Sequence, residues 1–571
     1  MDSSGLSHDS HRNSTLRSYR GCWTCRLRRK KCDERYPICD ICSGLLISCH
    51  YDDNKPEWMD GGVKQEEMAA RLKRQVKEMA HLRQKLPKDQ SPPSNRNQEL
   101  DLLPEPSPGL LARGPDCRFT RKNQSITLGR DDTILLSSFL EHVFPFLFPF
   151  YHPPILDGGK AWVLEMTMSS PVVRQICLCQ SSVFLYLAGD QGTGNTSWET
   201  ILSQTWEVFG VLSQSLQVLS GSNINEHLHG AVRVVASIMQ VLHFEIAVLS
   251  FENCLTHLNG ALNIFEQLLH VPDVLNPKSY SVIFNILVDL VGPPAHISSV
   301  PDLSIPSAEQ AAFRFSAGLL IFDDIIASTV RKQQPRLYRY HGGLLDRMND
   351  ITPPFDLEEI MGCQNWVVRQ LGEIATLEAW KQERKEAGDL DVMEMVHRAQ
   401  SIKELLVAQL MRLEIETQTS SNESSSLLKV LNPSYQYLHD VTGRNSLITR
   451  LWAHATLLYL AIVVSGWQPA SANVRSHISS IITLLTQANV PSLWLRTVVW
   501  PFCVAGCLAE PEQECKFRAL AAASQPVCVF KTVHKALEIM ETVWGLRGAS
   551  DTASWDLATF FSMQRDFILL V

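Results

Sequence analysis

Residues 22–49 read CWTCRLRRKKCDERYPICDICSGLLISC, and their six cysteines recur as two copies of Cys-x2-Cys-x6-Cys. The members are Cys22, Cys25, Cys32, Cys39, Cys42 and Cys49. So short a segment cannot bury enough apolar surface to fold unaided, so another interaction must hold it. Thiolates are good zinc ligands, and zinc takes four ligands in a tetrahedral array. The spacing therefore predicts a small zinc-organised domain over residues 20–52.

Two zinc ions need eight ligand positions, and six sulfurs supply eight only if two of them bridge both ions. The internal duplication favours this arrangement, because each half can hold one ion and share one sulfur. We therefore expect two Zn²⁺ ions as the cofactor. A zinc knuckle with a purely structural role, or a metal store, is the alternative. A metal store would not need the basic residues that lie inside the cluster.

Basic residues are concentrated around the cysteines, at Arg12, Arg17, Arg20, Arg26, Arg28, Arg29, Lys30, Lys31 and Arg35. Up to Cys49 they are opposed only by Asp33, Glu34 and Asp40, so this window carries a net charge of +6. The whole chain carries −8, so the remainder carries −14. A basic head on an acidic body predicts that the head binds a polyanion and the body does not. The same basic run is typical of a nuclear import signal.

The length and composition indicate at least two structural units in a chain that is not expected to be secreted. The chain has 571 residues, of which 45% are hydrophobic, so a large core is expected in addition to the cysteine-rich head. No hydrophobic segment opens the chain, and the 15 cysteines are therefore interpreted as reduced thiols or metal ligands. Residues 451–467 carry no formal charge, but they are too short for a typical membrane span and are interpreted as a buried helix.

Beyond the head, the pattern changes several times along the chain. We expect a disordered N-terminus over 1–19, a polar connector over 52–62, a helix over 63–86 that ends before Pro87, and a disordered linker over 87–130. Long amphipathic segments then dominate 131–571, which predicts one large all-α unit. One example is the apolar face predicted for Ile402, Leu405, Leu406, Leu410 and Leu413.

The helix over 63–86 has a heptad pattern that indicates a coiled coil. Met68, Leu72, Met79, Leu82 and Leu86 fall at alternating a and d positions together with Gln75, and they are the predicted homodimer contacts. Val76 is off this register, and a second register uses it with Leu72. Three heptads are the minimum for such a prediction. The alternative is a solvated helix that packs on its own chain.

The cysteine segment resembles the binuclear zinc cluster of fungal transcription regulators. That family has the same spacing, a basic stretch between its second and third cysteines, and a proline two residues before the fourth, as Pro37 is here. The resemblance implies that Cys22 and Cys39 bridge the two ions and that the other four cysteines are terminal ligands. It also implies that a short helix enters the major groove of double-stranded DNA and reads a CGG-like triplet.

The resemblance assigns the base contacts to Arg28 and Arg29, because Arg can engage O6 and N7 of guanine together. Arg26, Lys30, Lys31 and Arg35 would then mainly bind phosphates, which gives affinity and register but no sequence preference. Each single charge could equally be a solvated side chain. Because so many basic residues lie close together, it is harder to explain all of them as solvated side chains than to explain any single one in this way.

Two further segments, 139–151 with 158–162 and 500–507, resemble the helical regulatory region that follows many fungal zinc clusters, and we interpret them as core packing. Cys503 and Cys507 lack zinc-spaced partners and are expected to be buried thiols. We find no nucleophile, paired-carboxylate or phosphate-loop motif, so the chain is not expected to be an enzyme. The sequence thus predicts a nuclear regulator of RNA polymerase II transcription that binds DNA and contacts the transcription machinery or co-regulators. A helical enzyme or metabolite sensor with a zinc head, and a DNA-free scaffold, are the rival hypotheses.

Overall fold

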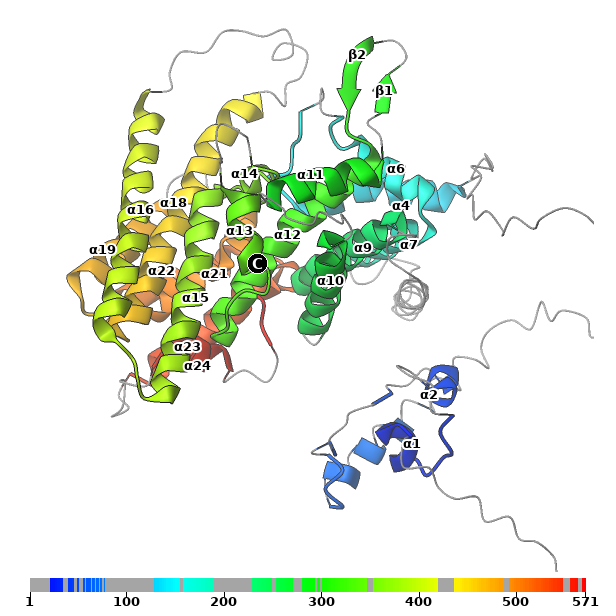
Figure 1. Ribbon diagram of the computed structural model, residues 1–571, viewed down its shortest axis with the longest axis horizontal. Coiled ribbons are helices and arrows are strands. Elements are labelled where there is room, and N and C mark those ends of the chain that lie inside the picture. Colours follow the sequence, from blue (N-terminus) through cyan, green and yellow to red (C-terminus); the bar gives the residue numbers. More distant parts are fainter. Residues whose placement is uncertain are drawn as a thin grey trace, which may run out of the picture. The chain divides into compact units, whose positions relative to one another are not determined.

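The protein was analysed as a computed structural model, which divides into two compact units, residues 1–120 and 121–571 (Figure 1). The structure describes residues 21–33, 39–45, 49–50, 55–56, 58–62, 64–66, 68–70, 72–73, 76, 128–154, 158–188, 228–248, 253–270, 280–292, 295–297, 300–346, 353–419, 436–486, 492–547, 555–562 and 567–571. The predicted disordered N-terminus and all but the last residues of the predicted linker lie outside these ranges.

The smaller unit contains two short helices, one in each half of the cysteine repeat. They are α1 (Trp23–Leu27) and α2 (Asp40–Leu45), drawn in dark blue in Figure 1. Each begins directly after the first cysteine of its half, so the sequence duplication is repeated in the backbone. Its fully buried apolar members are Cys22, Cys25, Cys39, Cys42 and Leu72. Such a small core, four-fifths of it cysteine, agrees with a domain that depends on metal for its fold.

The larger unit is mainly helical. Its first half contains α4 (Arg130–Ser138), the π-helix η1 (Phe139–Val143), α5 (Phe144–Leu147), α6 (Ala161–Ser169), α7 (Pro171–Ala188), α9 (Leu228–Val248), α10 (Cys254–Leu269), α11 (Tyr280–Val291) and α12 (Ala308–Arg331). Its second half contains α13 (Tyr338–Leu345), α14 (Leu357–Met361), α15 (Asn365–Ala387), α16 (Val392–Thr419), α18 (Gln436–Ser465), α19 (Ala472–Leu485), α20 (Ser492–Thr497), α21 (Val499–Cys507), α22 (Pro511–Ala523), the 3-10 helix η5 (Val527–Val529), α23 (Lys531–Gly545) and α24 (Leu557–Ser562).

One element departs from the predicted all-α architecture of this unit. Strands β1 (Ala295–Ile297) and β2 (Val300–Ile305) pair in antiparallel register and form a two-stranded hairpin that projects from the helices in Figure 1. The prediction missed it because the segment is short and contains Pro301, which disfavours a strand in sequence-based reasoning. The mainly helical class is otherwise confirmed.

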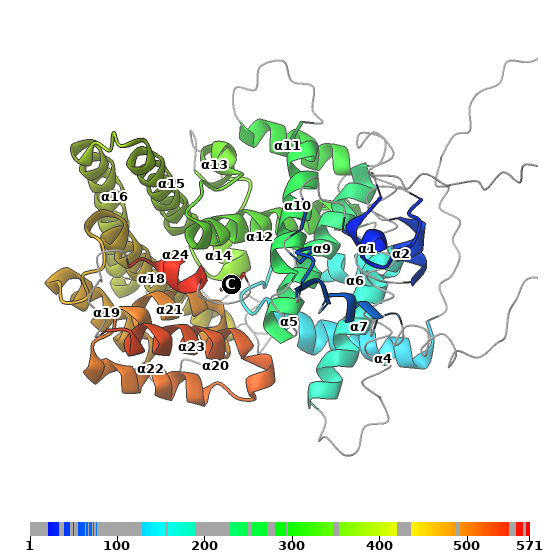
Figure 2. The ribbon, with the colours of Figure 1, turned by 90° about the horizontal axis from the view of Figure 1, so that it is seen from below.

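Helix α12 lies at the centre of the larger unit (Figure 2) and packs against α6, α9, α11, α15 and α24. It begins with a capping box in which Ser307 accepts from the N–H of Gln310, and it ends where Lys332 adopts a left-handed conformation. Residues on all sides of the helix are buried, as expected of a helix surrounded by others. Its buried carboxylates are paired: Asp323 lies 3.0 Å from His243, and Asp324 accepts from the N–H of Leu337 at 2.9 Å.

The two segments interpreted as core packing do contribute to the core, although Glu141, His142 and Ala161 of the first are exposed. Phe139, Phe144 and Phe148 are at most 3% exposed, and every residue of α21 is buried. The ring of Trp500 stacks on that of Trp452 at a centroid distance of 5.6 Å, and its Nε1–H donates to Thr329. These segments therefore join distant parts of the chain into one core.

Helix α18 contains most of residues 451–467, the apolar stretch interpreted as a buried helix. By length and composition α9 and α18 could each cross a membrane, but 78% of the relevant window of each is buried inside the protein. This burial agrees with the interpretation as core helices. On α16, Ile402, Leu406, Leu410 and Leu413 are buried, whereas Leu405 is 53% exposed. Its placement on the apolar face was wrong, because adjacent residues point about 100° apart around a helix.

Candidate metal centre and nucleic-acid interface

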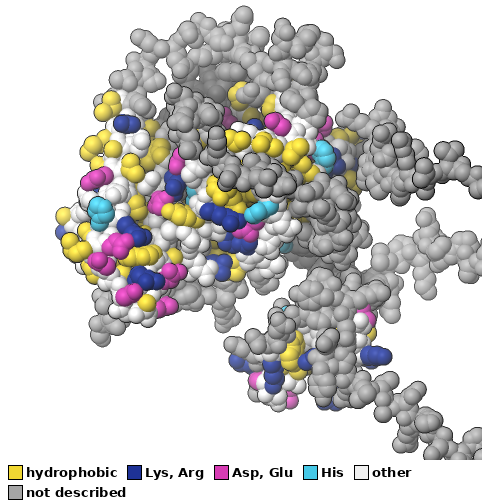
Figure 3. Space-filling view, viewed as in Figure 1, with side chains coloured by type: hydrophobic (Ala, Val, Ile, Leu, Met, Phe, Trp, Pro, Cys, Tyr) yellow, Lys and Arg dark blue, Asp and Glu magenta, His cyan; other side chains and the backbone are white. Residues whose placement is uncertain are grey.

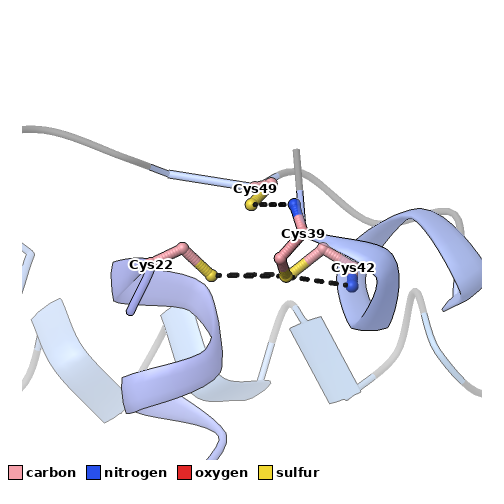
Figure 4. A group of neighbouring side chains, drawn as sticks. All are labelled: Cys22, Cys39, Cys42 and Cys49. Carbon is pink, nitrogen blue, oxygen red and sulfur yellow. Dashed lines mark hydrogen bonds between the residues drawn. The ribbon is translucent and has the colours of Figure 1, made fainter. Parts of the chain in front are cut away.

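The sulfur atoms of the six cysteines converge in the smaller unit. Cys22 Sγ lies 3.8 Å from Cys39 Sγ, and Cys25 Sγ lies 3.5 Å from Cys39 Sγ. Two sets of four ligand atoms each lie within 4.8 Å of one another, Cys22, Cys25, Cys32 and Cys39 in one and Cys22, Cys39, Cys42 and Cys49 in the other. The sets share two members, Cys22 and Cys39, so six sulfurs provide two groups of four. Figure 4 shows the second group.

The Cys-x2-Cys spacing has the same local effect in both halves. The N–H of Cys25 donates to Cys22 Sγ at 3.3 Å, and the N–H of Cys42 donates to Cys39 Sγ at 3.4 Å. Each first cysteine thus caps the helix that follows it and receives a hydrogen bond that stabilises a thiolate. The N–H of Cys39 also donates to Cys49 Sγ at 3.4 Å, which ties the last cysteine to the second half.

Several residues outside the cysteine pattern hold this centre together. A Cβ on Gly21 would lie 2.8 Å from Cys32 Cβ, so only glycine permits this close approach of the chain. The N–H of Trp23 donates to the carbonyl of His50 at 2.7 Å, and the N–H of His50 donates to Thr24 Oγ1 at 3.1 Å. These bonds join the two ends of the cluster. The sequence prediction missed these supporting residues, because neither glycine, threonine nor histidine is distinctive at these positions.

The donor set fits two zinc ions. Burial raises the pKa values of the Cys25 and Cys42 thiols above their usual range, so these sulfurs do not ionise readily by themselves. A bound cation removes this penalty, because a thiol that coordinates zinc is deprotonated outright. Six sulfurs within contact distance and two overlapping groups of four match the two tetrahedral sites expected for a binuclear cluster. The cofactor is accordingly two Zn²⁺ ions.

The basic run follows directly on α1, and its backbone makes a sharp turn at Arg29. The N–H of Arg29 donates to the carbonyl of Arg26 at 3.0 Å, and the N–H of Lys30 donates to the carbonyl of Cys25 at 2.9 Å. This pair of bonds is a Schellman motif, which needs a left-handed residue after the helix end. Arg29 has φ of 55°, although glycine is the residue that usually occupies this position. An arginine with an exposed side chain is therefore held in a costly backbone conformation just after the end of α1.

The other basic side chains differ in exposure. Lys30 and Lys31 are exposed, whereas Arg26 and Arg28 are half-buried. The guanidinium of Arg26 lies over the ring of Trp23 at 4.5 Å, and Arg28 Nη1 is buried without a hydrogen-bond partner among the described residues. Arg35 lies outside the described residues. Figure 3 shows Lys and Arg side chains prominent on the smaller unit. The side chains thus form a basic surface, within which Arg29 is the most exposed of the two predicted base-contacting residues.

The predicted dimerisation residues are only partly described. Helical residues occur between 64 and 76, where Met68 is half-buried and Leu72 is 1% exposed. Leu72 belongs to the apolar cluster of the cysteines, and Val76 packs against the same cluster. Met79, Leu82 and Leu86 lie outside the described residues. The first part of the helix therefore packs on its own chain, as in the alternative to a coiled coil.

Titratable groups in the larger unit form pairs that hold its helices together. His243 lies 3.0 Å from Asp323, and His257 lies 3.0 Å from Glu245. Within the described ranges, these groups do not converge into a third set of metal ligands. Cys503 and Cys507 are buried, as predicted, and burial raises the pKa of Cys503 well above the usual value for a thiol.

Comparisons with known proteins match both units. Residues 20–57 match the model of the fungal Zn(2)-Cys(6) binuclear cluster domain, and residues 134–570 match that of the fungal specific transcription factor domain. The second match covers well over half of the chain. None of the solved structures matches the chain.

Several curated relatives are similar over nearly their whole length. Transcription factor dibT of Pestalotiopsis microspora is 29% identical, with 96% of this chain and 99% of the relative covered. Pestheic acid cluster transcriptional regulator 3 of Pestalotiopsis fici is 28% identical, with 95% and 97% covered. Trichothecene biosynthesis transcription regulator TRI10 of Fusarium sporotrichioides is 26% identical, with 73% and 92% covered.

Proposed function

The chain belongs to the family of fungal-specific transcription factors that carry a Zn(2)-Cys(6) binuclear cluster, and from this we propose that it regulates RNA polymerase II transcription from specific DNA sites in the nucleus. The head places the protein on double-stranded DNA. The helical body passes the signal to the transcription machinery or to co-regulators. The chain acts by binding and not by catalysis.

The observation that carries the proposal is the position of Arg29. It is exposed and left-handed, and it stands two residues after the last residue of α1, a helix whose other end is capped by Cys22. A helix of this size fits the major groove, where guanine presents O6 and N7 as paired acceptors. An arginine fork matches this pair and distinguishes guanine from the other bases. We propose that Arg29, with Arg28, reads a CGG-like triplet.

The remaining charges have a different role in this proposal. Arg26, Lys30, Lys31 and Arg35 bind phosphates and set the register of α1 in the groove. The stacking of Arg26 on Trp23 supports this role, because it restricts the guanidinium before DNA is bound. Cys22 and Cys39 bridge the two zinc ions, and Cys25, Cys32, Cys42 and Cys49 are terminal ligands. Membership of both groups of four supports this assignment of the bridging pair.

The regulated genes are proposed from the relatives. Two of them are named for the pestheic acid cluster and for trichothecene biosynthesis. We propose that this chain likewise controls a gene set for a secondary metabolite. A transcriptome of a deletion strain, combined with mapping of the occupied promoters, identifies that set; occupancy confined to genes outside any biosynthetic cluster contradicts the proposal.

We also propose a homodimer on DNA. Leu72 and Val76 pack on the head, so the proposed seam uses Met79, Leu82 and Leu86, with Met68 at its margin. Sedimentation of the full chain, with and without Leu82→Asp and Leu86→Asp together, tests the seam. A mass of two chains that falls to one in the variant supports it, whereas one chain per particle in both contradicts it.

DNA binding itself is tested by titration of the full zinc-loaded chain onto duplexes that contain CGG or a scrambled triplet. The expected preference for CGG is on the order of a thousandfold, the lower range for specific over non-specific binding. Equal affinity for both duplexes contradicts the reading role. Absence of binding to either duplex favours the rival hypothesis, a helical sensor or enzyme with an inert head.

A further inference from the structure

The chain continues to contact the zinc-binding head after Cys49, the last cysteine of the head. His50 is bonded to the first turn of α1 through the N–H of Trp23 and through Thr24 Oγ1, at 2.7 and 3.1 Å. The His50 ring then contacts the ring of Trp58 edge to face, with a centroid distance of 5.4 Å. The polar connector therefore contacts the head through Trp58.

The next residues specify where a helix begins. Asp60 Oδ1 accepts from the N–H of Gly62 at 2.8 Å and from the N–H of Gln65 at 3.2 Å. Gln65 Oε1 in turn accepts from the N–H of Gly61 at 3.1 Å, and Gly61 has φ of 84°. These reciprocal bonds resemble those of a capping box, in which side chains accept from the free N–H groups at the start of a helix. The helical residues between 64 and 76 thus begin at a defined point.

The described helical residues between 64 and 76 contribute the one apolar side chain other than cysteine that is fully buried in the described part of the head. Leu72 is 1% exposed and lies in one apolar cluster with Cys22, Cys25, Cys39 and Cys42. Val76 lies four residues later, on the same face of the helix, and packs against the cluster as well. Leu27, the last residue of α1, and Leu45 of α2 line the same cluster. The apolar cluster that contains Leu72 therefore includes residues from both halves of the repeat.

We propose that the helix over 64–76 is the third structural element of the DNA-reading unit, and that Leu72 is the residue through which it positions α1. Leu27 directly precedes Arg28 and Arg29, so a shift of α1 against the cluster displaces both guanidinium groups. The zinc ions hold the cysteines but not the outward end of α1. Leu72 supplies apolar packing there that a segment this small otherwise lacks.

The proposal rests on the proposed function of the head, and it adds a consequence for the partner. A side chain buried in its own head cannot at the same time lie in a seam between two chains. The first predicted heptad is therefore occupied within the chain, and association with a second copy begins after residue 76.

The test uses the full chain loaded with zinc, with Leu72→Ala, the conservative Leu72→Met, and Lys73→Ala as a matched control at an exposed neighbouring position. Native mass spectrometry first establishes how many zinc ions each variant holds. Two readouts follow: hydrogen exchange of the α1 amides, and the ratio of affinities for CGG and scrambled duplexes. A residue with only a general stabilising role would leave the affinity ratio of zinc-loaded protein unchanged.

Leu72→Ala is expected to speed exchange at α1 and to lower the affinity ratio about tenfold, whereas Leu72→Met and Lys73→Ala retain a ratio close to that of the parent. The proposal is overturned if Leu72→Ala holds two zinc ions with unchanged exchange and ratio. If Leu72→Ala loses its zinc, the Leu72→Met variant tests the proposal instead, because packing accepts an apolar side chain of similar volume. In that case, a Leu72→Met variant whose affinity ratio falls below that of the parent overturns the proposal. A parent chain that does not prefer CGG contradicts the proposed function instead, and the exchange data still test the packing role.

Discussion

The N–H of Lys30 donates to the carbonyl of Cys25 at 2.9 Å, across a turn whose central residue, Arg29, has a positive φ. The bond connects a zinc ligand to the basic run. It closes the C-terminal end of α1 onto Cys25, and the side chains of Lys30 and Lys31 that follow are exposed. One backbone turn therefore links a cysteine of the metal centre to Arg29, the residue proposed to read DNA.

The first prediction concerns the conformational cost of Arg29. Arg29→Gly and Arg29→Ala both remove the guanidinium and should weaken binding to a cognate site by about 1–3 kcal/mol. They differ in backbone strain, because glycine adopts the left-handed conformation freely and alanine does not. Arg29→Gly should therefore make the head more stable than Arg29→Ala by about 1 kcal/mol. Thermal unfolding of the head and DNA titration check both parts; equal stability of the two variants contradicts the assignment of strain.

The second prediction separates base from phosphate contacts. Lys31→Ala should weaken binding to CGG and scrambled duplexes alike, and it should lower the slope of log affinity against log salt by about 1. The reason is that a phosphate contact releases counterions but carries no base information. Titrations at several salt concentrations measure both quantities. A loss confined to the CGG duplex would assign Lys31 to the bases.

The third prediction concerns metal removal. A strong chelator should abolish DNA binding and expose the cysteines of the head, because the four cysteines and Leu72 alone bury too little apolar surface. The helical signal in circular dichroism should remain, since the larger unit has an extensive core without metal ligands among its described residues. Mass spectrometry before chelation should find two zinc ions in each chain. Retention of CGG binding by metal-free protein would refute the role of zinc.

Individual residues show how much of the fold and of the candidate site could be predicted from the sequence. The six cysteines could be predicted to converge, since their spacing has few other uses, and the mainly helical class follows from the periodicity. The left-handed conformation of Arg29 could not be predicted, because the residue type that favours this conformation is glycine. The pairing of His243 with Asp323 joins residues 80 positions apart, and nothing in local sequence specifies it. Leu72 satisfies a heptad and a buried cluster equally well, so its pattern left both arrangements open.

The fourth prediction concerns the contact between α21 and α23. A Cβ on Gly506 would overlap Met540 Sδ, and the carbonyl of Gly506 accepts from Trp544 Nε1–H at 2.8 Å. Gly506→Ala should therefore destabilise the larger unit by about 1–3 kcal/mol through overpacking. Denaturant unfolding measures the loss. Adding Met540→Ala should produce less than the sum of the two single losses, whereas strict additivity would place the clash elsewhere.

The fifth prediction concerns the pH dependence of stability. Burial raises the pKa of Glu378 to about 7, a carboxyl that accepts a hydrogen bond from Tyr459 and is 8% exposed. A carboxyl whose pKa is higher in the folded than in the unfolded state stabilises the fold below its unfolded pKa. That contribution is lost as the pH rises through its folded pKa. As the pH rises from 4.5 to 7, the ionisation of Glu378 should lower the free energy of unfolding by about 3 kcal/mol. Glu378→Gln should restore this stability at neutral pH. Unfolding curves at several pH values test this, and a parallel pH profile for the variant contradicts it.

The unequal cores of the two units have a physiological consequence. We expect the fold of the head to depend on a scarce nutrient ion, and the body, whose described residues include an extensive apolar core, to keep its shape when that ion is removed. When a cell runs short of zinc, its pool of this regulator should stay soluble and intact while its promoters are vacated. Resupply of the ion would then restore gene control within the time of metal uptake, with no need for new protein synthesis.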